Sequence, residues 1–241
     1  MQMLETMGMD RLIVVDMHSG QMQGFLSPNV PSDNITAIKV GALYFAEQIE
    51  DRDDLNLVVV APHAKAVPRA KDFWNVLLQR GKPARFAMVM RKPALGELER
   101  KEMCKDKKDG NCEGDSKTVD GAPAYEVVGD DHVRGCTAII VDDILDSAES
   151  LSQTAETLKA AGAERIWAFA THGLFSPGAV DLIERSALDR LLVTNTAATG
   201  TVSSDETTKI EWISVAPLLA ETIRRVCEKE SLSPLFRVPD P

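Results

Sequence analysis

The chain has 241 residues and is 44% hydrophobic, which is enough to bury at least one substantial core within one or two domains. Its formal net charge of −10 argues against a nucleic-acid partner, because binding to a polyanion needs a clustered basic patch. The longest apolar runs fall far short of the roughly 20 residues that cross a bilayer, and the first residues lack a secretory signal pattern, so we expect no membrane partner and a cytoplasmic location.

Short aliphatic runs alternate with helical stretches along the chain. The runs lie at 12–16, 57–62, 86–90, 137–143, 165–172 and 190–196. Buried parallel strands have this composition. The stretch 149–162 is amphipathic and ends at a glycine, and a further helix is predicted from about Ala216 to Glu228. This alternation predicts an α/β fold in which a parallel sheet is flanked by helices.

One segment interrupts the alternation. Residues 96–126 are charged, contain glycine and include few large apolar side chains. We expect this segment to be a long exposed insertion.

The clearest candidate site follows the run 137–143, in the sequence VDDILDSAES. In open α/β sheets, ligands bind at the carboxyl ends of strands, where loops meet helix N-termini. Backbone N–H groups there would bind an anion, while Asp142 and Asp143 could accept hydrogen bonds from hydroxyl groups, so a sugar phosphate is the natural ligand. The anion-binding residues would be Asp146, Ser147, Ala148, Glu149 and Ser150. The alternative is a purely structural role, in which the two aspartates end a strand and the serines cap the helix that follows.

Several further motifs stand in an order that resembles one family over nearly the whole chain. They are VVDMHSGQMQGFLSP (14–28), PSDN (31–34), VVVAPHAKAVPRAK (58–71), ATHGLFSPGA (170–179), VTNT (193–196) and ISVAPLLAETIRR (213–225). Together with the 142–150 loop, they resemble the ribose-phosphate diphosphokinases, or PRPP synthetases, which have a type I phosphoribosyltransferase-like fold.

The resemblance implies a reaction and roles for individual residues. Family members transfer the β,γ-diphosphate of ATP to the C1 hydroxyl of ribose 5-phosphate, with magnesium. His18 would stand at the metal and ATP position, Asp142 and Asp143 would face the ribose hydroxyls, and residues 146–150 would surround the 5-phosphate. Arg91 and Lys92 lie near the family's basic loop, where cations stabilise charge on the transferring phosphates.

The resemblance also implies a domain organisation. Residues 1–35 would be the end of an incomplete N-terminal phosphoribosyltransferase-like domain, the remnant of a second domain similar to the main one. Residues 36–225, with the insertion 96–126, would form the C-terminal domain, and the tail 226–241 would pack toward the N-terminal part. The chain would then be either a fragment or a protein whose site depends on neighbouring subunits.

Two loops depart from the family pattern. Glu149 replaces a glycine that lets the backbone approach phosphate, and a like charge about 4 Å from a phosphate would cost on the order of 4 kcal/mol at an effective dielectric of 20. His63, Lys65 and Ala66 replace an aspartate and two glycines. Magnesium does not favour a nitrogen ligand, and no second His or Cys lies near His63, so a plain loop histidine is the simpler interpretation.

These departures, with the insertion, resemble the PRPP synthetase-associated proteins, which are non-catalytic relatives that assemble with active subunits. We therefore expect an associated or regulatory subunit with little activity alone, in a homo- or hetero-oligomer with homologous PRPP synthetase subunits. The alternative is an active ribose-phosphate diphosphokinase that binds ribose 5-phosphate and ATP.

Overall fold

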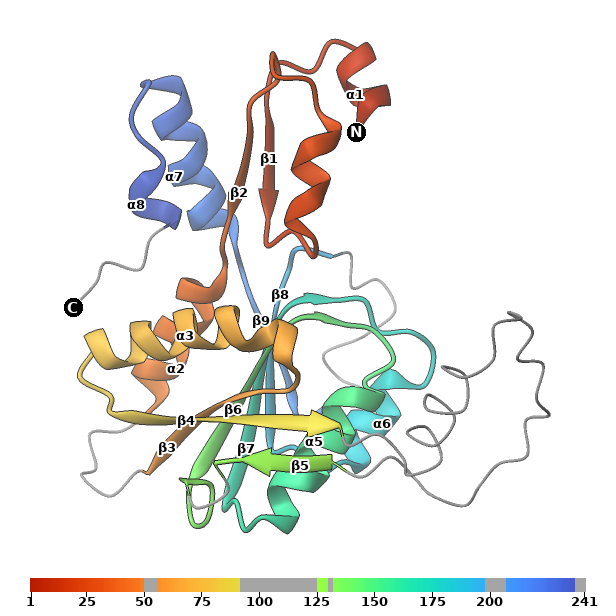
Figure 1. The fold of residues 1–241 in the computed structure, drawn as a ribbon, viewed down its shortest axis with the longest axis vertical. Coiled ribbons are helices and arrows are strands. Elements are labelled where there is room, and N and C mark those ends of the chain that lie inside the picture. The colour runs from red at the N-terminus through yellow and green to blue at the C-terminus, as the bar shows by residue number, and fades with distance from the viewer. Residues whose placement is uncertain (50–55, 92–124, 130–131, 198–206, 237–241) are drawn as a thin grey trace, which may run out of the picture.

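The computed structural model describes residues 1–49, 56–91, 125–129, 132–197 and 207–236 (Figure 1). Among these residues, no helix is long and apolar enough to span a membrane.

A mixed sheet forms the centre of the described structure, with seven strands in the order β5-β4-β3-β6-β7-β8-β9. All neighbouring strands are parallel except β4 and β5, which are antiparallel. The strands are β3 (Leu57–Ala61), β4 (Ala84–Arg91), β5 (Tyr125–Val128), β6 (Thr137–Leu145), β7 (Arg165–Gly173), β8 (Arg190–Thr194) and β9 (Ile210–Ile213). The predicted α/β fold with a largely parallel sheet is confirmed.

Helices cover both faces of this sheet (Figure 1). Alternate residues of β3 belong to different cores: Val58 and Val60 pack on one side, and Val59 packs on the other. The first core is completed by α5 (Glu149–Ala160) and α6 (Ala179–Arg185), and the second by α2 (Ile38–Gln48) and α3 (Val67–Gln79). Because both faces are buried, the central strands contain runs of apolar residues, which made them recognisable in the sequence.

The helix α2 packs very closely on the sheet. A β-carbon at Gly41 would lie 2.3 Å from Cε2 of Phe169 in β7, so this position has no room for any other side chain. Phe45 of the same helix stacks on Trp167 at a centroid distance of 5.5 Å. The second core therefore depends on aromatic rings that fit closely against one glycine.

We refer to residues 1–35 as the N-terminal lobe, whose two strands form a sheet apart from the seven-stranded one. It contains α1 (Gln2–Thr6), a 3-10 helix at Gly20–Phe25, and the parallel strands β1 (Leu12–Val15) and β2 (Ser32–Ile35). Figure 1 shows this lobe, in red and orange, next to α7 (Ala216–Cys227) and α8 (Ser233–Phe236), in blue. The short helix α8 contacts β2.

Buried polar contacts attach the N-terminal lobe to the carboxyl end of β7. The carboxylate of Asp16 accepts hydrogen bonds from the N–H of Ala37 (2.9 Å) and the hydroxyl of Thr171 (2.7 Å). The ring of His172 lies 3.0 Å from the carbonyl oxygen of Asp16 through Nε2 and 2.7 Å from the hydroxyl of Thr196 through Nδ1. The lobe is therefore held over the edge of the sheet at which the parallel strands end.

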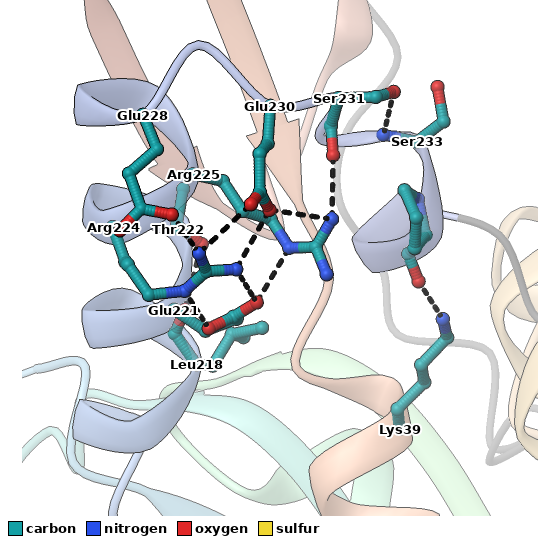
Figure 2. A network of polar contacts seen from close by, with 11 residues as sticks. Lys39, Leu218, Glu221, Thr222, Arg224, Arg225, Glu228, Glu230, Ser231 and Ser233 are labelled. Atoms are coloured by element: carbon teal, nitrogen blue, oxygen red, sulfur yellow. Dashed lines mark hydrogen bonds and ion pairs between the residues drawn. The ribbon is translucent and has the colours of Figure 1, made fainter.

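Ion pairs join the end of α7 to the turn that leads into α8 (Figure 2). Glu221 accepts hydrogen bonds from Arg224 (2.9 Å) and Arg225 (2.7 Å), and Arg224 also pairs with Glu228 and Glu230. We refer to Glu221, Arg224, Arg225, Glu228 and Glu230 as the α7 network.

The structure corrects one boundary of the sequence analysis. Tyr125 and Glu126, which we assigned to the end of the charged insertion, belong to β5 and pair with β4. The remainder of that segment, from 96 to 124, lies outside the described residues.

Candidate functional site

A cavity of about 190 Å³ opens at the carboxyl end of β6. Its wall combines the end of β6, the loop that follows and the first turn of α5 with residues of β7 and β8. Lining residues include Asp142, Asp146, Ser147, Ala148, Ser150 and Ala170. Most of the residues predicted to bind a sugar phosphate therefore line this cavity. It lies at the carboxyl ends of the strands, where ligands bind in open α/β sheets.

The loop between β6 and α5 presents backbone donors. Ala148 has φ 62° and ψ 1°, a left-handed conformation that turns the chain into α5 at the next residue. Within the described residues, no acceptor pairs with the N–H groups of 146–150. The first N–H groups of a helix have no partner in the helix and carry its positive dipole end. This geometry suits an anion such as a phosphate group.

The loop is anchored to the turn after β7. The N–H of Leu174 donates to the carbonyl of Leu145 (2.8 Å), and the N–H of Ser176 donates to the carbonyl of Asp146 (3.2 Å). The hydroxyl of Ser176 also donates to the carboxylate of Asp146. Because Asp146 is already held by Ser176, its role in the site is to shape the loop as well as to line the cavity.

Glu149 differs from its expected role in one respect. The left-handed residue of the loop is Ala148, whereas Glu149 is the first residue of α5, with ordinary helical geometry and an exposed side chain. A glycine is therefore not required at 149 for backbone conformation. Water screens an exposed carboxylate, so its repulsion of a phosphate about 4 Å away falls from the value expected above to about 1 kcal/mol.

The carboxylate of Asp143 is buried among cationic and polar groups. One oxygen accepts from the N–H of Ile144 (3.0 Å), and the other lies 2.8 Å from Nδ1 of His18 and 3.0 Å from the guanidinium of Arg69. Its side chain is 7% exposed. Burial alone would raise the pKa of Asp143, but the positive charge of Arg69 and the hydrogen bond with His18 outweigh burial and lower it.

Asp142 has a histidine partner of its own. The Nε2 atom of His63 lies 3.5 Å from its Oδ1 atom, which also accepts from the N–H of Asp143 (2.9 Å). The Nδ1 atom of His63 accepts from the N–H of Ala66 (3.1 Å), so the proton is on Nε2 and faces Asp142. The hydrogen bond with Asp142 raises the pKa of His63 above its ordinary value, against the opposing effect of burial.

These pairings decide how well magnesium fits. Magnesium prefers octahedral oxygen ligands, whereas the nitrogen of His18 and both carboxylates already pair with groups of the chain itself. Within the described residues, no group of three or more His, Cys, Asp and Glu side chains is arranged to hold a metal ion. The donor set does not fit magnesium, and the geometry gives the metal role expected for His18 no support.

The structure places the remaining predicted residues only in part. Arg91 is the last residue of β4, which ends at the same edge of the sheet as β6, and Lys92 lies outside the described residues. Sequence reasoning missed Arg69. Its position in the first turn of the helix after β3 was visible in the sequence, but its contact with Asp143 depends on β3 lying beside β6, which chain order does not determine.

Comparison with known proteins identifies relatives of this chain. A family model described as "Phosphoribosyl synthetase-associated domain" matches residues 104–237. Ribose-phosphate pyrophosphokinase from Aquifex aeolicus is 35% identical over 235 residues, which are 97% of this chain and 63% of that protein. The same enzyme from Hyphomonas neptunium is 33% identical, over 97% of this chain and 64% of that protein.

A solved structure is also similar. The crystal structure of phosphoribosylpyrophosphate synthetase from Mycobacterium smegmatis superposes with a TM-score of 0.70 at 28% identity, covering 95% of this chain and 62% of that one. The phosphoribosyltransferase-like fold class is thereby confirmed. The chain spans less than two thirds of the length of these relatives. It belongs to the phosphoribosyl synthetase family, as the motif order predicted.

Proposed function

We propose that the chain is an associated subunit of PRPP synthetase assemblies that binds ribose 5-phosphate at the carboxyl end of β6 and has little activity alone. The phosphate would meet the N–H groups of 146–150, and the sugar hydroxyls would lie near Asp142 and Asp143. The partners would be homologous PRPP synthetase subunits, in a homo- or hetero-oligomer. The chain would act in the formation of 5-phosphoribose 1-diphosphate for nucleotide biosynthesis.

One observation carries the proposal of low activity. Both carboxylates of the acidic pair, Asp142 and Asp143, already have basic partners within the chain, with His63 at 3.5 Å and Arg69 at 3.0 Å. Diphosphate transfer needs groups that stabilise the charge developing on the transferred phosphates. Carboxylates and basic groups that pair with one another are less available to stabilise the transferred phosphates, although they can still lie beside a bound sugar.

A second candidate function is that of an active ribose-phosphate diphosphokinase, which transfers diphosphate from ATP to ribose 5-phosphate. The loop after β6 favours it, because its N–H groups have no acceptor among the described residues and they surround a cavity. The two candidates share a binding site and differ in turnover.

The test compares turnover with assembly. The purified chain is supplied with ATP, magnesium and ribose 5-phosphate, and AMP formation is measured. In parallel, the chain is co-expressed with an active homologous ribose-phosphate pyrophosphokinase, and the purified complex is assayed. We expect no AMP above the blank from the isolated chain, and co-purification with a changed rate of the active partner.

Each outcome separates the candidates. AMP formation by the isolated chain at a rate near that of its homologue would establish the active enzyme instead. A chain that neither turns over nor associates with the homologue would exclude both candidates. The variant Ser150→Asp is the matched test of the binding site, because a carboxylate beside the N–H groups of α5 should repel phosphate and weaken any effect that depends on ribose 5-phosphate.

A further inference from the structure

We propose that Arg69, as a counter-ion, and His63, as a hydrogen-bond donor, are built-in partners of the acidic pair, so that the site after β6 binds ribose 5-phosphate without magnesium. This inference rests on the proposed function, which makes a ribose phosphate the ligand of the site. It goes further by naming the groups that take the place of the metal beside the acidic pair and by excluding the metal from the binding step.

The first argument is the occupancy of the carboxylate oxygens. Both oxygens of Asp143 are engaged, one by the N–H of Ile144 and the other by His18 and Arg69. The Oδ1 atom of Asp142 is engaged by the N–H of Asp143 and lies near His63. A magnesium ion, which binds oxygen at about 2.0–2.1 Å in a strict octahedron, would have to displace these donors.

The second argument is charge. The acidic pair carries two negative charges, which would repel an anionic ligand at the loop that begins with Asp146. Arg69 is 18% exposed and always charged, so it offsets one of these charges in a partly buried setting where electrostatic interactions are strong. His63 turns its Nε2–H toward Asp142 at 3.5 Å, because its Nδ1 atom accepts from the N–H of Ala66. The charge of Arg69 and this donor together take the place of a divalent cation.

The third argument is that the backbone fixes this arrangement. β3 ends at Ala61 beside β6, so the next residues lie directly over the acidic pair. The N–H of Ala66 holds the ring of His63 through Nδ1 and leaves Nε2 facing Asp142. Arg69 follows in the first turn of α3. The imidazole and the guanidinium come from one segment whose conformation is set by local hydrogen bonds, before any ligand enters.

The test is a calorimetric titration of ribose 5-phosphate into the full chain, once with EDTA and once with excess magnesium. We expect dissociation constants that agree within about threefold, a difference below 1 kcal/mol. Binding that occurs only with magnesium would overturn the inference and leave the proposed ribose-phosphate site intact. Absence of binding under both conditions would reject the ribose-phosphate site itself, and the inference with it.

Two variants test the assignment to His63. His63→Gln removes the imidazole donor that faces Asp142 and should weaken binding in EDTA by about tenfold, as expected for the loss of one hydrogen bond to a charged group. The control is His132→Gln, because His132 is exposed and precedes β6, at the end of the strand opposite to the site. Equal affinities for both variants and the natural chain would overturn the role of His63.

The last measurement involves no sugar phosphate. Magnesium chloride alone, titrated into the natural chain, should give no saturable heat, whereas His63→Asp adds a third carboxylate beside Asp142 and Asp143 and should create a measurable magnesium site. Saturable magnesium binding by the natural chain that His63→Asp leaves unchanged would contradict the proposal. The EDTA titration of the natural chain needs no variant, so the proposal stays testable even if a substitution impairs folding.

Discussion

Two adjacent residues share the start of α5 and act differently on a phosphate. Ala148 adopts the left-handed conformation, which costs a residue with a side chain roughly 1–2 kcal/mol. Glu149 places a carboxylate at the positive end of the helix dipole, where an anion stabilises the helix. The carboxylate of Glu149 therefore lies at the helix end that also suits a phosphate. The side chain and a bound phosphate would both interact with the positive end of the α5 dipole.

This competition predicts the effect of Glu149→Gln. Removal of the exposed charge should raise the affinity for ribose 5-phosphate by about 1 kcal/mol, roughly fivefold, because the repulsion acts through water. The control is Glu164→Gln, which removes the same charge from an exposed position beyond the other end of α5. Calorimetry on both variants decides: a gain near a thousandfold would mean that Glu149 enters the cavity, and no gain would place the phosphate elsewhere.

The His63 ion pair predicts a pH dependence of stability. Hydrogen bonding to Asp142 raises the folded-state pKa of His63 above its ordinary value of 6.5, Asp143 adds to the effect, and Arg69 opposes it. A raised pKa means that the stabilisation is fully present below pH 6.5 and is lost as the pH rises through the folded-state pKa.

Urea unfolding of the natural chain and of His63→Gln at about pH 6 and about pH 8.5 measures this effect. Between about pH 6 and about pH 8.5, the free energy of unfolding should fall more for the natural chain than for the variant. The difference should be at most about 1 kcal/mol, since the pair is partly exposed and screened. Parallel pH profiles for the two proteins would show that the pair contributes nothing to folding.

At the scale of elements, sequence and structure agree where both faces of a strand are buried. β3 reads LVVVA and β6 contains the aliphatic run AIIV, so both were predictable. β2 reads SDNI and β9 reads IEWI, each only four residues long, so neither has the composition or length of a buried strand. The pairing of His63 with Asp142 could not be predicted, because it depends on β3 lying beside β6, which chain order does not determine.

The α7 network predicts a local response. The hydrogen bonds from Arg224 and Arg225 lower the pKa of Glu221 to about 2, so the pairs of Glu221 should persist as the pH falls below the ordinary glutamate range and be lost only near pH 2. Glu221→Gln should speed amide hydrogen exchange in residues 228–235, with almost no change in global stability, because the pairs lie at the surface and are screened by water.

Hydrogen-exchange mass spectrometry compares this variant with Asp181→Gln, whose partner Arg185 lies on the exposed surface of α6. Faster exchange near residues 228–235 in both variants, or in neither, would mean that the α7 network does not order the end of the chain.

At the scale of the whole molecule, the site depends on the contact between the N-terminal lobe and the sheet. His18 belongs to the lobe and Asp143 to β6, and the two meet because Asp16 binds Ala37 and Thr171 nearby. Asp16 is 6% exposed and has φ 44°, so a buried carboxylate in an unusual conformation fixes the position of the lobe.

Asp16→Ala should therefore loosen the lobe as a unit. It leaves the N–H of Ala37 and the hydroxyl of Thr171 without their acceptor, and it forces alanine into the left-handed region, for a total cost of about 2–5 kcal/mol. Asp16→Asn keeps one acceptor oxygen and a side chain that tolerates this conformation, so its cost should be smaller.

In Asp16→Ala, amide hydrogen exchange of residues 12–35 should accelerate far more than that of residues 137–145. The control is Asp33→Ala, which breaks the surface pair with Arg11 in the same lobe. If the control loosens the lobe as much as Asp16→Ala, the buried carboxylate is not what joins the lobe to the sheet.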